Sequence, residues 1–268
     1  GGGARAMNIE VLPPDISESL EKFTIVAPQR IRFGLGAVKN VGSNIVEEIV
    51  RERERGGRFN TLQDFIERIA HKDLNKKSLE SLVKCGAFDA LGERGQILAN
   101  IERLLDYNRE MQRAKQNRQT SLFGLTPEAQ PVSFRLKDAA VAEKRETLQW
   151  ERELLGLYVS DHPMRDYAEK FAARKAIPIN EIAAARNLTI LVGGLISGIQ
   201  KILTKSGQPM LFVTLEDLTA RAEVLVFPKV LEENPGVWQE EKIVFLRGRV
   251  SDKDGVHKLL CEKAVEVA

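Results

Sequence analysis

Hydrophobic residues recur at helical spacing from about Leu35 to Arg118, and at a spacing of two residues after about Leu188. The first pattern predicts packed helices and the second predicts β-strands. Before the helices, residues 7–33 hold proline-rich extended sequence, typical of a small hairpin around Pro28 or of the tail of a preceding domain. We therefore predict a multidomain protein in which a helical region is followed by an all-β region.

The stretch Ile31–Val50 predicts a short helix, a tight turn at Val41-Gly42-Ser43 and a second helix. Gly42 tolerates a positive φ, and Ser43 is a favourable N-cap for the helix that follows. A turn that leads into a helix leaves backbone N–H groups pointing outward at the positive end of the helix dipole, which suits a phosphate oxygen. Such a site contacts no base edge, so it would hold nucleic acid irrespective of sequence. The alternative is an ordinary αα-hairpin that contains glycine.

Further helices are predicted to start at Thr61, with near capping-box spacing, and at Asn75. The second of them ends at another glycine turn, Cys85–Asp89, so the region resembles two tandem helix–hairpin–helix units. One long helix is then predicted from about Gly95, and its polar end, Arg113–Arg118, is expected to fray.

The segment Gln119–Phe123 places two large apolar residues after a polar stretch and before Gly124, Pro127 and Pro131, which mark a loop. This pattern favours a peptide that stays in solvent and inserts Leu122 and Phe123 into a pocket of a partner. The alternative is that both residues fold back on the helical core, as most Leu-Phe pairs do. Residues 126–145 are predicted to be a linker. An apolar helix around Trp150 and Leu154 follows, and His162 before Pro163 is predicted to be a turn residue.

The β region begins with Leu188–Leu203, a long strand that glycines 193, 194 and 198 allow to bend or bulge. Strands are predicted at 209–216, 220–227, 242–251 and from 258 onward, with a short helix at 228–233 and a hairpin turn at Asp254-Gly255. Five strands, a coiled first strand and a helix between the third and fourth are the pattern of an OB-fold barrel.

The chain has 268 residues, 43% of them hydrophobic, and a net charge of only +2, so any contact with nucleic acid must come from local patches. Cys85 and Cys261, together with three scattered histidines, predict no disulfide framework and no zinc site, which suits a reducing cytoplasm. We predict no metal, no cofactor and no membrane partner. Residues 1–6 are typical of an appended leader.

Four motifs occur in order: Ile31–Gly42, Phe59–Phe65, Cys85–Leu91 and Trp150–Pro163. Together they resemble the C-terminal half of the bacterial replicative DNA polymerase III alpha subunit, over nearly all of residues 7–268. The resemblance implies a tail of the polymerase fingers region (7–33), a tandem helix–hairpin–helix domain (34–118), a clamp-binding peptide with linker (119–147), a helical connector (148–187) and an OB-fold domain (188–268).

The same resemblance implies that the catalytic aspartates lie upstream of Met7, so this segment would synthesise no DNA although its parent would be a DNA-directed DNA polymerase. Gln119–Phe123 matches the family's pentapeptide for the β sliding clamp. Thr120 stands where the family more often has leucine, and this difference is expected to weaken binding to the clamp. A further C-terminal domain would bind the clamp-loader tau subunit, and the location would be the replisome at the nucleoid, in the bacterial cytoplasm.

These considerations give three sets of candidate site residues and no catalytic residue. For duplex DNA they are Lys39, Asn40, Val41, Gly42, Ser43, Asn44, Lys76, Lys77, Lys84, Gly86 and Ala87. For the clamp they are Gln119, Thr120, Ser121, Leu122 and Phe123. For single-stranded template they are Lys201, Lys205, Met210 and Phe212.

Alternatives stay open for several of these residues. The lysines would equally suit solvated helix faces, and Phe212 and Phe227 would suit a barrel core. The barrel would also serve as a protein-docking module, and the whole chain as a scaffold without nucleic-acid contact. Two other classes fit less well. A DNA ligase that uses NAD joins the same modules but needs a cysteine zinc site between them, which two distant cysteines cannot form. A Holliday-junction-binding protein has the barrel first, whereas here the barrel comes last.

Overall fold

This computed structural model describes residues 9–120 and 134–267. The chain divides into two units, one made of Ile9–Asp161 and one that includes His162–Ala268. The division falls inside the segment 148–187, which the sequence predicts as one connector. Each unit is described by itself.

The first unit begins with three short strands, β1 (Glu10–Leu12), β2 (Thr24–Ala27) and β3 (Arg30–Arg32). Their order in the sheet is β1-β3-β2, with β1 parallel and β2 antiparallel to β3. The β2–β3 hairpin around Pro28 is the one that the sequence predicts. Ile16 and Phe33 from this segment are buried in the same core as the helices, so residues 9–33 pack as part of this unit.

A 3₁₀ turn, η1 (Leu35–Ala37), precedes the helices. They are α1 (Ser43–Gly56), α2 (Leu62–Arg68), α3 (Lys76–Lys84), α4 (Arg94–Ala99), α5 (Ile101–Thr120) and α6 (Lys144–Leu155). Two of the starts that the sequence predicts are confirmed by their caps. The Thr61 side chain accepts a hydrogen bond from the Asp64 amide, and Asn75 and Ser78 form a reciprocal capping box.

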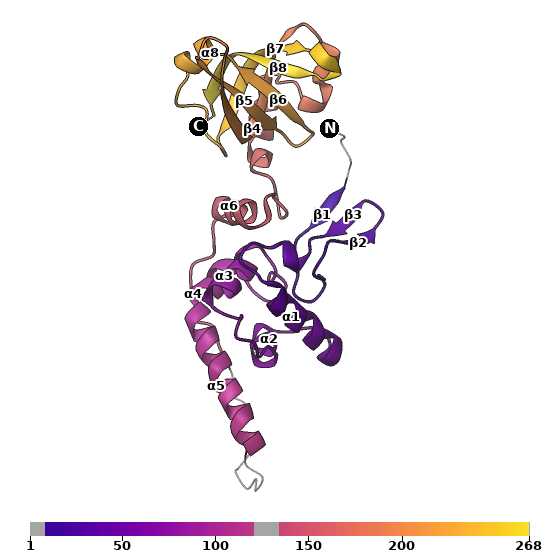
Figure 1. Ribbon diagram of the computed structural model, residues 1–268, viewed down its shortest axis with the longest axis vertical. Coiled ribbons are helices and arrows are strands. Elements are labelled where there is room, and N and C mark those ends of the chain that lie inside the picture. The colour runs from indigo at the N-terminus through magenta and orange to yellow at the C-terminus, as the bar shows by residue number, and fades with distance from the viewer. Residues whose placement is uncertain (1–8, 121–133, 268) are drawn as a thin grey trace. The chain divides into compact units, whose positions relative to one another are not determined.

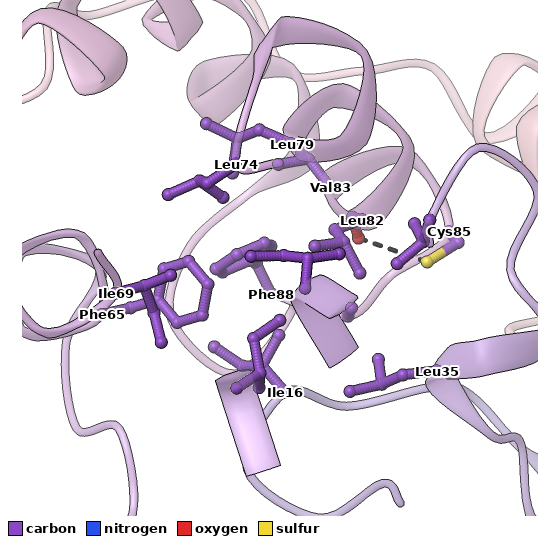
Figure 2. Packing of buried hydrophobic residues seen from close by; sticks show 14 of the residues in the cluster. Ile16, Leu35, Phe65, Ile69, Leu74, Leu79, Leu82, Val83, Cys85 and Phe88 are labelled. Atoms are coloured by element: carbon purple, nitrogen blue, oxygen red, sulfur yellow. Dashed lines mark hydrogen bonds between the residues drawn. The ribbon is translucent and has the colours of Figure 1, made fainter. Parts of the chain in front are cut away.

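Aromatic rings from α2 and from two non-helical segments, before α2 and after α3, meet in the core of this unit (Figure 2). The ring centroids of Phe65 and Phe88 lie 4.8 Å apart in an edge-to-face arrangement, and Phe59 packs on Phe65 in the same way at 5.0 Å. The Cys85 thiol lies in this core and donates to the Leu82 carbonyl. Burial raises the pKa of this thiol to about 12, so Cys85 is a packing residue.

The single long helix predicted from Gly95 is two helices, α4 and α5, separated at Asn100 (Figure 1). The side-chain Nδ2 of Asn100 donates to the backbone carbonyls of Gln96 and Lys137. Its side-chain Oδ1 accepts a hydrogen bond from the backbone amide of Lys137. Asn100 therefore fastens the segment around Lys137 to the helix junction. The hydrophobic spacing continues across the break, which is why the sequence does not reveal it.

The second unit starts with η2 (Pro163–Tyr167), α7 (Ala168–Ala173) and η3 (Ile179–Ala185). The barrel strands are β4 (Thr189–Leu203), β5 (Pro209–Glu216), β6 (Arg221–Val226), β7 (Ile243–Ser251) and β8 (Lys258–Glu266). Helix α8 (Pro228–Glu233) lies between β6 and β7, and the 3₁₀ turn η4 (Lys253–Gly255) joins β7 to β8.

These strands close into a barrel of order β4-β5-β6-β8-β7 (Figure 1). Strand β4 pairs with both β5 and β7, and its register shifts between Ile196 and Gly198, so the predicted bend in the first strand is confirmed. The parallel pairing of β6 with β8 completes the closure. Five strands and the placement of α8 confirm the predicted OB-fold.

Inward side chains such as Val192, Val213 and Val224 are buried in the barrel interior.

In residues 9–120 and 134–267, no helix is both long and apolar enough to cross a bilayer. The same residues contain no group of three or more His, Cys, Asp or Glu side chains that is placed to hold a metal ion.

Candidate nucleic-acid interfaces

The turn before α1 lies where the sequence predicts it, but its backbone differs in two details. Asn40 takes the left-handed conformation, with φ 69°, whereas Gly42 is extended at φ −78° and ψ 162°. Gly42 rather than Ser43 is the N-cap, and Ser43 is the first residue of the helix. Both corrections have one cause: asparagine also tolerates a positive φ, so the reversal is complete before Gly42 is reached.

The start of α1 is open to solvent. Gly42, Ser43 and Asn44 are exposed, the N-cap receives no side-chain hydrogen bond, and the first turn contains no acidic residue. The first amides of an α-helix have no acceptor within the helix, so these N–H groups and the dipole of a 14-residue helix point outward together. This exposed helix start, Gly42–Asn44, is called the α1 opening below, and it can hold one anionic oxygen.

Neighbouring residues either flank this opening or fix it to the core. Lys39 and Asn40 are exposed beside it, and the Lys39 amide donates to the Leu154 carbonyl of α6 at 3.0 Å. Val41 is buried, and its amide donates to the Val38 carbonyl. Val41 therefore anchors the turn and offers no group to a ligand.

The second glycine turn does not repeat the first. Gly86 has φ +95°, as its position in a turn requires, but its amide donates to the Val83 carbonyl and the Ala87 amide donates to the Leu82 carbonyl. These bonds cap the C-terminus of α3, and both residues are buried. The prediction that Gly86 and Ala87 offer amides to a phosphate is therefore wrong, because both donors are already used inside the fold.

The predicted lysines differ in their surroundings. Lys76 is exposed and its Nζ lies 3.2 Å from a Glu102 carboxylate oxygen. Lys77, its neighbour at the start of α3, is exposed. The Lys84 ammonium lies 5.6 Å from the centroid of the Trp150 ring, which holds α3 against α6.

In the second unit, strand register places a row of side chains across the outside of the barrel. Phe212 of β5 lies opposite Leu225 of β6, which lies opposite Leu260 of β8, and all three are half-buried. Exposed polar residues continue the row at both ends: Gln200 of β4 beside Phe212, and Arg249 of β7 beside Leu260. An aromatic and aliphatic centre with a cationic end suits a base and its phosphate.

The other residues predicted for single strands relate to this row differently. Met210 shares the face of Phe212, two residues along β5, but is 8% exposed and cannot stack on a base. Lys201 lies opposite Leu211, a core residue, so strand alternation places it on the other face from Phe212. Lys205 lies exposed in the turn between β4 and β5. Sequence reasoning missed Leu225, Leu260 and Arg249, because only the register reveals the row.

Two protein families match the chain. The family described as "Helix-hairpin-helix motif" matches residues 8–97, and the one described as "OB-fold nucleic acid binding domain" matches residues 190–267. Proteins named DNA polymerase III subunit alpha are also similar. The one from Saccharopolyspora erythraea is 36% identical over 98% of the chain, and the one from Thermus aquaticus is 38% identical over 85% of it. The chain is a relative of one segment of the DNA polymerase III alpha subunit.

This segment spans about a fifth of the alpha subunits it matches, 23% of the Saccharopolyspora protein and 19% of the Thermus protein. Solved structures align with it less closely. A mitochondrial single-stranded DNA binding protein from S. cerevisiae aligns over 30% of this chain and 92% of its own, at 10% identity and a TM-score of 0.26.

The segment proposed to bind the clamp falls mostly outside the described residues. Helix α5 includes Gln119 and Thr120 as its last residues, whereas Ser121, Leu122 and Phe123 belong to the stretch 121–133 that the structure does not describe. Its role in clamp binding therefore stays a prediction.

Sequence reasoning also missed the residue that organises the motif Trp150–Pro163. Glu151 of α6 is fully buried and accepts hydrogen bonds from the amides of Val159 and Ser160 and from the Ser160 hydroxyl. The Arg94 guanidinium donates to the same carboxylate at 3.0 Å and to Asp89 on its other side. Burial opposes the Arg94 charge, but the two carboxylates outweigh it and raise its pKa.

This network holds α6 against the helical unit that carries the α1 opening. A signal for it exists in the sequence, because Glu151 occupies the same helix face as Leu148, Leu154 and Leu155. A lone charge within an apolar helical stripe indicates a buried partner.

His162 forms a turn, as the sequence predicts, and it also joins that turn to the barrel. Its Nδ1 accepts a hydrogen bond from the Met164 amide and its Nε2 lies 3.2 Å from a Glu216 oxygen. Burial raises the pKa of Glu216, but the hydrogen bond from His162 and the charge of Arg221 lower it more, so the net pKa is below its usual value.

Proposed function

We propose that this chain is a DNA-holding and tethering part of a DNA polymerase. In this account, the α1 opening binds the backbone of duplex DNA and the row on the barrel holds single-stranded template. The observation that carries the proposal is the start of α1, where Gly42, Ser43 and Asn44 are exposed residues, inside the region that matches the helix-hairpin-helix family.

The chemistry of the opening favours contact with phosphate alone. Backbone amides and the helix dipole attract an anionic oxygen but do not distinguish bases. Lys39 beside the start of α1 and Lys77 of α3 are exposed, and each would add charge to a contact with DNA. For each phosphate neutralised by a cation, log K falls by about 0.9 per log unit of salt, so a few contacts give weak and salt-sensitive binding. A polymerase needs such a contact, because it must hold every sequence it copies.

Fluorescence anisotropy with two labelled duplexes of unrelated sequence tests this proposal. We expect equal affinities that fall with salt, and weaker binding by the variant Gly42→Ala. A Cβ at Gly42 meets nothing within 4 Å and its φ is negative, so the variant should fold while the methyl group blocks close approach of a phosphate. Gly236→Ala in the barrel unit is the matched control, since a Cβ there also meets nothing within 4 Å. Binding that depends on sequence, or equal binding by both variants, would contradict the proposal.

The barrel row supports a second contact, with single strands. Stacking on an aromatic ring contributes about 1–3 kcal/mol per base, so Phe212→Ala should weaken binding of a labelled oligonucleotide several-fold or more. Val265→Ala removes an exposed apolar side chain away from the row and serves as control. A protein-docking barrel predicts no saturable, salt-sensitive signal from the wild type.

A third element, the peptide Gln119–Phe123, would tether the polymerase to the sliding clamp. Burial of Leu122 and Phe123 in a pocket would contribute about 1.5–3 kcal/mol each, partly offset by ordering of the segment, which gives micromolar affinity. Weak clamp and DNA contacts on one chain reinforce each other through effective concentration, and each can still release. Replacing both residues with alanine should abolish clamp pull-down and leave duplex binding intact. Unchanged pull-down would remove the peptide from the account.

A further inference from the structure

The outer strand of the three-stranded sheet in the first unit has exposed apolar side chains. In the order β1-β3-β2, β2 is an edge strand and no described strand pairs with its outer side. Three exposed large hydrophobic residues lie in or next to this strand: Phe23, Ile25 and Val26. Strand β2 itself, Thr24–Ala27, carries no charged residue.

The sheet register shows that this exposure continues a buried row. Val11 of β1 lies opposite Ile31 of β3, which lies opposite Ile25 of β2. Val11 packs against the helical core and Ile31 is half-buried, whereas Ile25 at the edge is 78% exposed. The apolar row therefore leaves the core and ends uncovered at the outer strand.

Phe23 extends the same surface. It lies on the same side as Ile25, two residues along the chain, and its ring packs on the buried Phe33 at 4.5 Å between centroids while half of its own surface stays exposed. Native edge strands usually carry a charge, a bulge or a covering segment, because unpaired backbone groups beside apolar side chains attract another strand. The bulge between Ile25 and Ala27 shortens this edge but does not cover Ile25.

We propose that β2 is a docking edge for an extended segment from the remainder of the same polypeptide. The segment would pair with the backbone of β2 and place an apolar side chain against Ile25. The choice of occupant rests on the proposed function, a part of a longer polymerase: the alpha subunits that match this chain have about four-fifths of their length outside the match, so further polypeptide would be available at high effective concentration. An edge without charged residues suits an apolar strand better than an acidic nucleic acid.

Amide hydrogen exchange compares the chain with the full-length polypeptide that contains it. We expect the amides of Phe23–Ala27 to exchange at least about tenfold more slowly in the full-length protein, while the amides of α3 are unchanged. Ile25→Asp in the full-length protein should restore fast exchange at β2. Val141→Asp, at another exposed apolar position in the same unit, should not.

Ile25→Thr, which keeps a β-branched side chain, serves as a second variant and should give an intermediate effect. Equal exchange at β2 in both proteins would overturn the proposal. It would also be overturned if the chain alone showed protection at β2 that rises with concentration together with a dimer in sedimentation, since the occupant would then be a second copy. Neither result bears on duplex binding, so failure here leaves the proposed function standing.

Discussion

Replacing Ser43 with proline tests the phosphate contact by removing a single hydrogen. Ser43 is the first residue of α1, where proline is favoured because the amide there has no acceptor within the helix and the φ of proline fits the first turn. The preceding residue, Gly42, is extended at ψ 162°, which is the conformation that a following proline requires. The fold should therefore accept the substitution with no loss of stability.

The magnitude follows from the bond that is lost. A hydrogen bond to a charged group contributes about 1.5–3 kcal/mol, so S43P should weaken duplex binding about 10- to 100-fold. The matched control is S43A, which loses the hydroxyl but keeps the amide and should bind like the wild type. Anisotropy at fixed salt measures both variants, and thermal unfolding checks that they are folded. If S43P is folded and binds duplex as tightly as S43A, this amide makes no phosphate contact and the reasoning fails.

Three further predictions concern the supports of these surfaces. Glu151→Gln leaves Arg94 without its buried carboxylate partner and should lower the free energy of unfolding in urea by about 3–5 kcal/mol, whereas Glu153→Gln, at an exposed position on the same helix, should change it by less than about 0.5 kcal/mol. Equal effects would show that the network adds no stability. Because the pKa of Glu216 is lowered in the fold, its ion pairs stabilise the barrel above its usual pKa of 4.5, and this contribution is lost as pH falls through the lower folded pKa. Glu216→Gln should thus destabilise at pH 7, with a difference from wild type that shrinks on acidification; a difference independent of pH would contradict this. Burial raises the pKa of Cys261 to about 12, so this thiol should resist alkylation until the protein unfolds, and rapid labelling of the native protein would contradict its burial.

Hydrophobic spacing predicts the helical unit and the barrel, and Gly42 with Ser43 predicts the position of the turn before α1. The sequence does not distinguish Asn40 from Gly42 as the residue with positive φ, because both residue types tolerate that conformation. The break at Asn100 is also hidden, since the residue that stabilises it, Lys137, is 37 positions away.

The candidate sites were harder to predict than the fold. Two glycine turns look alike in the sequence, yet the one at Gly86 is a buried helix cap beneath Arg94, whose partner Glu151 is 57 residues further along. Likewise, Lys201 and Phe212 are both plausible ligands for a single strand, and only the pairing of β4 with β5 shows that they lie on opposite faces. Contacts between distant segments decide which local motifs remain available to a partner.

The most direct measurement is an amide spectrum of the ¹⁵N-labelled chain during titration with duplex DNA. If α1 captures a backbone phosphate, the resonances of Gly42, Ser43 and Asn44 shift in proportion to the bound fraction while those of Gly86 and Ala87 stay in place. Shifts confined to other residues, with the three amides at the start of α1 unmoved at saturation, would contradict the account.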